Sequence, residues 1–178
     1  MKQLNNIIIE TERLYLRKLQ LSDMQALKDI LQDKEVMYAY EHGFSDEEVV
    51  QWYERQQERY VQDGVGLLAV ILKSEDKLIG QCGLTLQDYK DKKVYEIGYL
   101  FNKSYWHNGY AVESAAACKE YAFQKLKIDE VYSIIRTNNY PSQKVAERNG
   151  MTVKDEIIKH YYNIDMPHYV YSIKNPLI

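Results

Sequence analysis

The sequence has little of what stabilises a secreted or membrane protein. Its 178 residues include two cysteines, Cys82 and Cys118, so it has one disulfide at most. The N-terminal residues show no apolar stretch followed by a small-residue cleavage site. No apolar run approaches the ~18–20 residues that span a bilayer. These absences predict a reduced, cytoplasmic protein without a membrane partner, in which Cys118 is a buried structural thiol.

Patterns for metal binding and covalent catalysis are also missing. The two cysteines and four histidines show neither C-x-x-C nor H-E-x-x-H spacing. No G-x-S-x-G elbow presents a nucleophilic serine. The sequence therefore predicts no metal site and no serine acyl-enzyme.

The charge balance argues against binding to nucleic acid. The chain has 23 Lys and Arg against 26 Asp and Glu, a net charge of −3, so no general attraction for phosphate backbones is expected. Hydrophobic residues make up 46% and charged residues 28%, an ordinary globular composition. Only three prolines occur, and no linker or repeat interrupts the chain. We expect one domain over residues 1–178.

Hydrophobic periodicity and capping signals predict alternating strands and helices. Strands are expected at 7–19, 67–72, 78–86, 94–101, 131–136, 152–162 and 169–173. Helices are expected from Ser22 onward, at 45–64, with Val49, Tyr53, Gln56 and Tyr60 on one face, at 109–126 and at 142–149. The order is βααβββαβαββ. Because the strands at 94–101 and 131–136 flank a helix, they are expected to be parallel neighbours in an otherwise antiparallel α/β sheet.

The most informative stretch runs from Glu96 through a short loop into the helix that begins near Gly109. The first N–H groups of a helix have no intrahelical partners and lie at the positive end of its dipole. An anion can bind there without a metal or a lysine. Gly109 would let a phosphate approach the backbone, although a glycine beside a helix start is often only a turn.

Several segments together resemble the GCN5-related N-acetyltransferases, most closely the ribosomal-protein N-terminal acetyltransferases. The resemblance extends from about residue 9 to residue 173. Its carrying segments are Thr11-Glu12-Arg13-Leu14-Tyr15-Leu16-Arg17, Ile79-Gly80, Gly83-Leu84, Glu96-Ile97-Gly98-Tyr99, Tyr105-Trp106, Gly109-Tyr110-Ala111 with Glu113, Asn139-Tyr140-Pro141-Ser142 and Arg148-Asn149-Gly150-Met151.

The resemblance implies a binding site for acetyl-CoA. In the family's Q/R-x-x-G-x-G/A motif, Trp106 stands first, Gly109 and Ala111 fill the last two positions, and His107 replaces a usual second glycine. A bulge at Gly98 would separate the two parallel strands, and N–H groups near Leu100 would bind the thioester carbonyl. The expected cofactor-binding residues are Leu100, Phe101, Trp106, His107, Asn108, Gly109, Tyr110, Ala111, Val112, Asn139 and Ser142. Asn139 and Ser142 also fit ordinary turn and N-cap roles.

Three residues are candidates for proton transfer. Glu96 is a candidate base, although a carboxylate on a strand face is as often structural. His160 is a second candidate, with a suitable pKa but a position more typical of a surface residue. Ser142 is the candidate proton donor to the departing thiolate, because Ala146 stands where many relatives have a tyrosine.

The resulting hypothesis is an acetyl-CoA-dependent N-acetyltransferase that works by direct amine attack in a ternary complex. The preferred acceptor is the α-amine of a peptide or protein. The alternatives are a small amine, such as a polyamine, amino sugar or amino acid, and a non-catalytic acyl-CoA sensor. Glu10, Glu12 and Glu41, expected near the acceptor side, favour a polycation. A homodimer is ranked slightly above a monomer.

Overall fold

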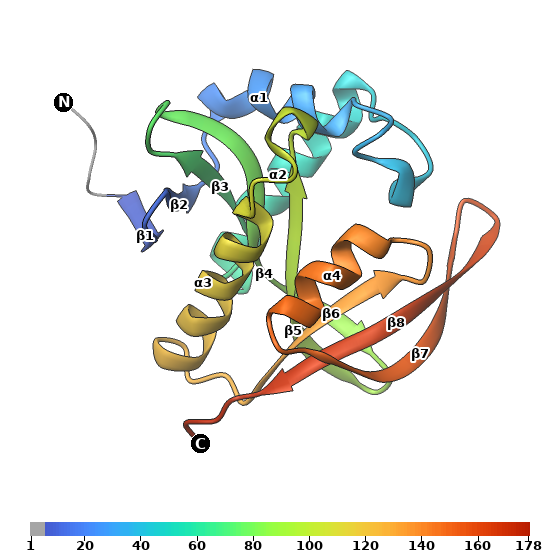
Figure 1. The fold of residues 1–178 in the computed structure, drawn as a ribbon. Coiled ribbons are helices and arrows are strands. Elements are labelled where there is room, and N and C mark those ends of the chain that lie inside the picture. Colours follow the sequence, from blue (N-terminus) through green and yellow to red (C-terminus); the bar gives the residue numbers. More distant parts are fainter. Residues whose placement is uncertain (1–5) are drawn as a thin grey trace.

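The computed structural model describes residues 6–178, which form one mixed sheet flanked by helices (Figure 1). The strands are β1 (Ile7–Glu10), β2 (Leu14–Lys18), β3 (Leu67–Leu72), β4 (Lys77–Tyr89), β5 (Lys92–Phe101), β6 (Glu130–Arg136), β7 (Thr152–Tyr161) and β8 (Ile164–Lys174). The helices are α1 (Met24–Leu31), α2 (Asp46–Gln62), α3 (Tyr110–Gln124) and α4 (Tyr140–Arg148). The strand order is β1-β2-β3-β4-β5-β6-β8-β7, and only β5 and β6 pair in parallel. The expected mixed sheet is confirmed.

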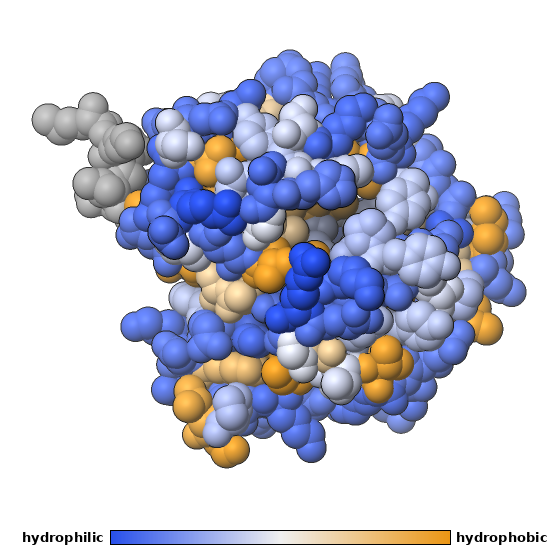
Figure 2. All heavy atoms as spheres, viewed as in Figure 1, coloured by the Kyte–Doolittle hydropathy of each residue, from blue (hydrophilic) through white to orange (hydrophobic). Residues whose placement is uncertain are grey.

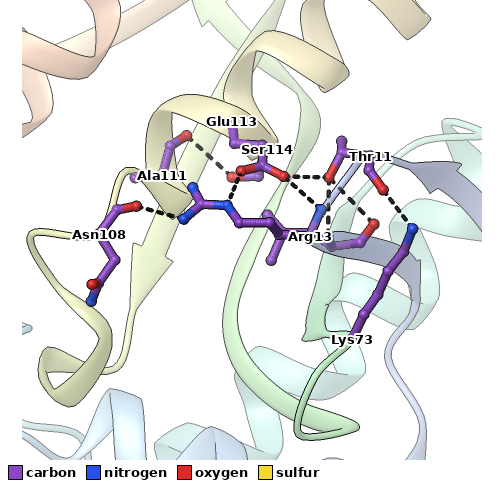
Figure 3. Close-up of polar contacts among 8 residues, drawn as sticks. Thr11, Arg13, Lys73, Asn108, Ala111, Glu113 and Ser114 are labelled. Atoms are coloured by element: carbon purple, nitrogen blue, oxygen red, sulfur yellow. Dashed lines mark hydrogen bonds and ion pairs between the residues drawn. The ribbon is translucent and has the colours of Figure 1, made fainter.

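The N-terminal segment differs from the expectation of one strand over residues 7–19. It folds as a hairpin of β1 and β2, because Thr11 begins a tight turn in which its N–H donates to the carbonyl of Leu14 at 2.9 Å. The alternation in the sequence persists in β2, where Leu14 and Leu16 are fully buried. The turn leaves Thr11 and Arg13 pointing toward α3 (Figure 3).

The two faces of the sheet pack against different helices. In β3, Leu68, Val70 and Leu72 join the core that includes α3, whereas Leu67, Ala69 and Ile71 join the core of α1 and α2. A strand covered on both faces explains the continuous apolar run in this part of the sequence. In Figure 1, α1 and α2 lie on the far side of the sheet from α3.

The ends of α1 and α2 follow capping chemistry. Ser45 and Glu48 form the expected capping box of α2. Its buried face contains Val49, Trp52, Gln56 and Tyr60, so Trp52 lies on this face instead of the expected Tyr53. Before α1, a short 3₁₀ turn over Leu21–Asp23 is capped by Gln20 and Asp23 rather than Ser22. Among the described residues, no helix is long and apolar enough to cross a membrane.

The strands β5 and β6 separate soon after they meet. Their parallel pairing covers Tyr95 with Val131 and Glu96 with Tyr132. The register of β5 against β4 continues without a shift through Gly98, so the bulge expected at Gly98 is absent from that pairing. The opening therefore arises because the β5–β6 pairing ends, not because β5 gains an extra residue.

Candidate active site

A cavity of about 1020 Å³ lies where β5 and β6 diverge. It is lined by residues of β5, β6, α2, α4 and the start of α3, together with the α1–α2 segment and the β7–β8 hairpin. Figure 2 shows the surface hollowed beside α4, near the middle of the view. The cavity therefore reaches both faces of the sheet through the gap between two strands.

The exposed edge of β5 presents backbone groups to this gap. The hydroxyl of Ser133 on β6 donates to the carbonyl of Ile97 at 2.8 Å, which shows that the Ile97 backbone faces β6. Backbone groups alternate along an antiparallel strand, so the N–H groups of Tyr99 and Phe101 lie on this same edge. Beyond Glu96 the β5–β6 ladder has ended. These two N–H groups can therefore bind a carbonyl oxygen in the gap.

The start of α3 also faces the cavity. Gly109 caps the helix with φ of 80°, and His107 has φ of 64°. Both angles lie in the left-handed region that favours glycine, which agrees with the expectation that His107 replaces a glycine. Within residues 6–178 no side chain caps the helix, so the first-turn N–H groups remain available for an anion. This arrangement fits the pyrophosphate of coenzyme A.

The hairpin between β1 and β2 holds the start of α3 in place (Figure 3). Glu113 accepts hydrogen bonds from the Thr11 hydroxyl at 2.7 Å and from Nε of Arg13 at 2.7 Å. Arg13 also donates to the carbonyl of Asn108 at 3.0 Å and lies over the ring of Tyr110. Although burial opposes ionisation of Glu113, the hydrogen bonds from Thr11 and Arg13 lower its pKa. The helix start is therefore fixed by an ionised carboxylate.

Glu96 points toward the other side of the gap. Leu100, four residues along and on the same side of the strand, packs against the α1–α2 core, whereas Ile97 and Tyr99 pack against the α3 core. The alternation of side chains thus places Glu96 on the α2 face. Burial raises the pKa of Glu96, while the charges of Lys159 and Arg59 and a 2.6 Å hydrogen bond from the Ile134 N–H act in the opposite direction. A half-buried carboxyl of increased basicity thus lines the cavity.

Ser142 lies on the opposite side of the gap, in the first turn of α4. Asn139 is the N-cap of this helix and accepts from the Ser142 N–H at 3.3 Å and from the Tyr38 hydroxyl at 2.6 Å. The Ser142 hydroxyl lines the cavity and has no hydrogen-bond partner within residues 6–178. Ala146, at the position where the resemblance implies a tyrosine in many relatives, is buried in the α3 core.

Most of the residues expected at the site come together around this cavity. They are Glu96, Leu100, Phe101, Trp106, His107, Gly109, Tyr110, Ala111, Val112, Asn139 and Ser142. Asn108 is not among the lining residues, and its side chain donates to the carbonyls of Tyr105 and Trp106. His160 is exposed on β7, pairs with Asp165 at 2.8 Å and also lies outside the lining. The structure does not bring His160 to Glu96 and Ser142.

The expected carboxylates near the acceptor side are placed differently. Glu10 pairs with Lys73, and neither Glu10 nor Glu12 lines the cavity. Glu41 forms an ion pair with Arg136. The side of the cavity near Glu96 is instead rich in cations, because the sequence places Arg55 and Arg59 one helical turn apart on the same face of α2 as Trp52.

These cations were missed by sequence reasoning. Arg59 and Lys159 line the cavity near Glu96, Arg55 lines it from α2, and Lys144 and Arg148 line it from α4. A detectable signal was the spacing of Trp52, Arg55 and Arg59, because it places both cations beside the buried stripe of this amphipathic helix. The position of Lys159 had no such signal, since it depends on the tertiary path of β7.

A mixed sheet that opens beside a helix N-terminus is the arrangement expected of an acyl-CoA-dependent transferase, and comparison with known proteins identifies the family. A family profile described as an acetyltransferase (GNAT) domain matches residues 13–152. The chain belongs to the GNAT family of acetyltransferases, which use acetyl-CoA as the acetyl donor.

Individual relatives agree with this assignment. The uncharacterized protein YkkB of Bacillus subtilis (strain 168) is 33% identical, over 84% of this chain and 87% of its own length. A GNAT-family acetyltransferase from Bacillus anthracis is 29% identical with a TM-score of 0.79, over 94% of this chain and 98% of that one. A RimL ribosomal L7/L12 α-N-protein acetyltransferase solved with coenzyme A has a TM-score of 0.79 over 94% and 97% of the two chains, and at 18% identity shows the shared fold alone.

Proposed function

We propose that this protein transfers the acetyl group of acetyl-CoA to the α-amine of a peptide or protein by direct attack in a ternary complex. The observation that carries the proposal is the placement of Glu96 and Ser142 on opposite sides of the gap between β5 and β6. A thioester in this gap would have its leaving sulfur toward α4 and its carbonyl carbon open to an amine from the α2 side.

The α3 and α4 side suits the donor. The first-turn N–H groups of α3 would bind the pyrophosphate, and Lys144 and Arg148 on α4 add positive charge to the same wall. The indole of Trp106 is held by its hydrogen bond to the Phe101 carbonyl at 2.9 Å, so its ring stays beside the path between the helix and the gap.

The chain's own groups then supply each part of the reaction. Glu96 accepts the proton of the attacking amine, directly or through a water, as its carbon–nitrogen bond forms. The Tyr99 N–H stabilises the negative charge that develops on the carbonyl oxygen. As the carbon–sulfur bond breaks, the Ser142 hydroxyl donates a hydrogen bond to the sulfur and relays a proton to it from water. Tyr99 fits this role better than Leu100, whose N–H faces β4.

The charge of the cavity favours an α-amine over a polyamine. An α-amine with a pKa of ~7.7–8.0 is already ~10% neutral at pH 7, whereas an alkyl amine with a pKa of ~10.4 is neutral in only ~1 molecule in 10³–10⁴. Arg59 and Lys159 lie near Glu96, the carboxylate proposed for proton transfer. Each additional positive charge on a polyamine would be repelled there.

The test is a steady-state comparison of a Ser- or Ala-initiated peptide with spermidine from pH 6 to 10. Release of the coenzyme A thiol and the mass increase of one acetyl group are measured together. We expect turnover of the peptide near neutral pH. Efficient spermidine acetylation at pH 7 with an inert peptide would overturn the proposed acceptor, and saturable acetyl-CoA binding without amine-dependent thiol release would indicate a sensor.

A further inference from the structure

We infer that the acceptor carries a carboxylate close to the amine that is acetylated, and that Arg59 binds this carboxylate. The inference rests on the proposed function, because it deepens the identity of the acceptor at the same site. It is carried by the contacts of Arg59, by the charges around it and by its placement relative to Glu96.

Arg59 is a half-buried cation with little local compensation. It lines the cavity from α2, and its hydrogen bond to a described residue is a long 3.4 Å contact with the neutral amide oxygen of Gln56. Within residues 6–178 no carboxylate oxygen lies within 4.0 Å of its guanidinium. Burial and the neighbouring charge of Arg55 lower the pKa of Arg59, and the charges of Asp63 and Glu96 oppose this only in part. A guanidinium held in this way gains more from an anionic ligand than one that is exposed or already paired.

The carboxylates around the cavity are committed elsewhere. Glu41 pairs with Arg136, and Glu48 accepts from Ser45 and contacts His42 at 2.8 Å. Near Glu96 the lining therefore presents two cations, Arg59 and Lys159, with Arg55 on the same face of α2, while its other carboxylate, Glu48, is already in contact with His42. This excess of positive charge would attract an acceptor with a negative group and repel one with further amines.

The placement of the two central groups matches a zwitterionic acceptor. Glu96 and Arg59 lie close enough for each to influence the pKa of the other, yet they form no direct ion pair. Glu96 is held instead by the Ile134 N–H. An amine at Glu96 with a carboxylate at Arg59 would pair both groups at once. Gly98 leaves room beside Glu96, because a Cβ there would meet only Leu67 Cδ2, at 3.5 Å.

Two kinds of acceptor offer this chemistry, and matched substrates separate them. The carboxylate belongs either to the side chain of an acidic N-terminal residue or to a free amino acid. The first arm compares Asp-Ala-Ala-amide with Asn-Ala-Ala-amide, which differ by one charge at nearly equal size. The second arm compares alanine with alaninamide. Each amine is assayed by coenzyme A release at several pH values, so that the comparison is made at equal concentrations of neutral amine.

We expect the charged member of at least one pair to have a roughly 10- to 100-fold higher kcat/KM, the range for a hydrogen-bonded charge pair. Arg59→Gln should reduce this ratio toward one, and Arg59→Lys should retain part of it. Lys125→Gln, at an exposed position just after α3, removes the same charge outside the cavity and should leave the ratio unchanged.

Other results would overturn the inference. Equal kcat/KM values within both pairs for the unaltered protein would do so without any variant, so instability of Arg59→Gln leaves the test intact. A preference that persists in folded Arg59→Gln would also exclude Arg59 as the carboxylate site. If the neutral peptides are acetylated and the charged ones are not favoured, the inference fails while the proposed function stands. If no amine causes release of coenzyme A, the proposed function fails, and the inference fails with it.

Discussion

The hydroxyl of Tyr99 on β5 donates a hydrogen bond to the main-chain carbonyl of Ser142 on α4 at 2.6 Å. Burial raises the pKa of Tyr99, so the phenol stays protonated and remains a donor. The bond links β5 to α4 and fixes the first turn of α4 against the strand whose Tyr99 N–H is proposed to bind the oxyanion. The position of the Ser142 hydroxyl therefore depends on Tyr99.

Substitutions at these two positions should distinguish a group that acts on the leaving sulfur, Ser142, from one that only holds Ser142 in place, Tyr99. Ser142→Ala removes the group proposed to act on the departing sulfur, so kcat should fall by about 10²-fold or more while the KM for acetyl-CoA changes little. Tyr99→Phe removes one hydrogen bond of about 1 kcal/mol and should produce a smaller decrease in kcat. Steady-state kinetics of both variants give the comparison. An unchanged kcat with an increased KM for acetyl-CoA in Ser142→Ala would show that Ser142 only contacts acetyl-CoA and takes no part in the chemical step.

Gly109→Ala should weaken acetyl-CoA binding. Its φ of 80° costs a non-glycine residue roughly 1–2 kcal/mol, so the turn before α3 would rearrange and displace the first-turn N–H groups. Gly64 has a similar φ of 72°, lies outside the large cavity and has no atom within 4 Å of an added Cβ. Gly64→Ala is thus a matched control, with similar strain and unchanged affinity. Calorimetric titration with acetyl-CoA that gives equal affinities for the two variants would contradict this placement of the pyrophosphate.

Lys159→Gln should move the acid limb of the pH profile to higher pH. Burial already raises the pKa of Glu96, and Lys159, the Ile134 N–H and Arg59 lower it. Loss of the Lys159 charge removes one lowering influence, so the base becomes ionised only at higher pH. The pH dependence of kcat/KM with one acceptor measures the shift, with Lys125→Gln as the control. An acid limb that stays in place would show that Glu96 is not the titrating base.

Asp23→Asn should be strongly destabilising. Asp23 is buried and its carboxylate accepts two hydrogen bonds from Arg17, at 2.8 and 2.9 Å, and one from the Gln20 N–H. Removal of one partner from a buried ion pair costs about 3–5 kcal/mol. The control is Asp88→Asn, which removes an exposed ion pair with Lys93 and should lower the free energy of unfolding by less than about 1 kcal/mol. Urea denaturation measures both free energies of unfolding, and similar values would refute the distinction.

Both thiols should be unreactive in the folded protein. The Sγ atoms of Cys82 on β4 and Cys118 on α3 lie 3.6 Å apart, and both residues are buried. Their hydrogen bond and burial raise the pKa of Cys118 well above its usual range, so little thiolate forms. A thiol-specific reagent should label neither cysteine before denaturation and both after it. Rapid labelling under native conditions would show that the β4–α3 interface opens.

The regular elements were largely predictable because their signals are local. The alternation in β2, the continuous apolar run of β3, the Ser45–Glu48 capping box and the glycine before α3 each act over a few residues. The separate β1 strand was not predictable in the same way. Its turn at Thr11 depends on the tertiary contacts of Thr11 and Arg13 with Glu113, which is about 100 residues away in sequence.

The donor side of the site was predicted better than the acceptor side. Trp106 to Val112 form one continuous segment, so a motif can describe them. Arg59 and Lys159 come from α2 and β7 and meet Glu96 only in the folded chain. The expected bulge at Gly98 was wrong for the β4–β5 pairing, since the end of a strand pairing leaves no mark in the sequence of either strand.

The short β5–β6 pairing has a mechanical consequence. The sheet consists of two halves, β1 to β5 and β6 to β8, which are joined by only two residue pairs, Tyr95 with Val131 and Glu96 with Tyr132. Beyond these pairs, side-chain hydrogen bonds such as the one from the Ser133 hydroxyl to the Ile97 carbonyl hold the two halves in place. The backbone N–H groups of β5 beyond Glu96, which a continuous sheet would pair with β6, would bind the thioester under the proposed mechanism. Binding of acetyl-CoA should therefore make the whole sheet more rigid, because the ligand would supply hydrogen bonds between the two halves that the β5–β6 pairing lacks.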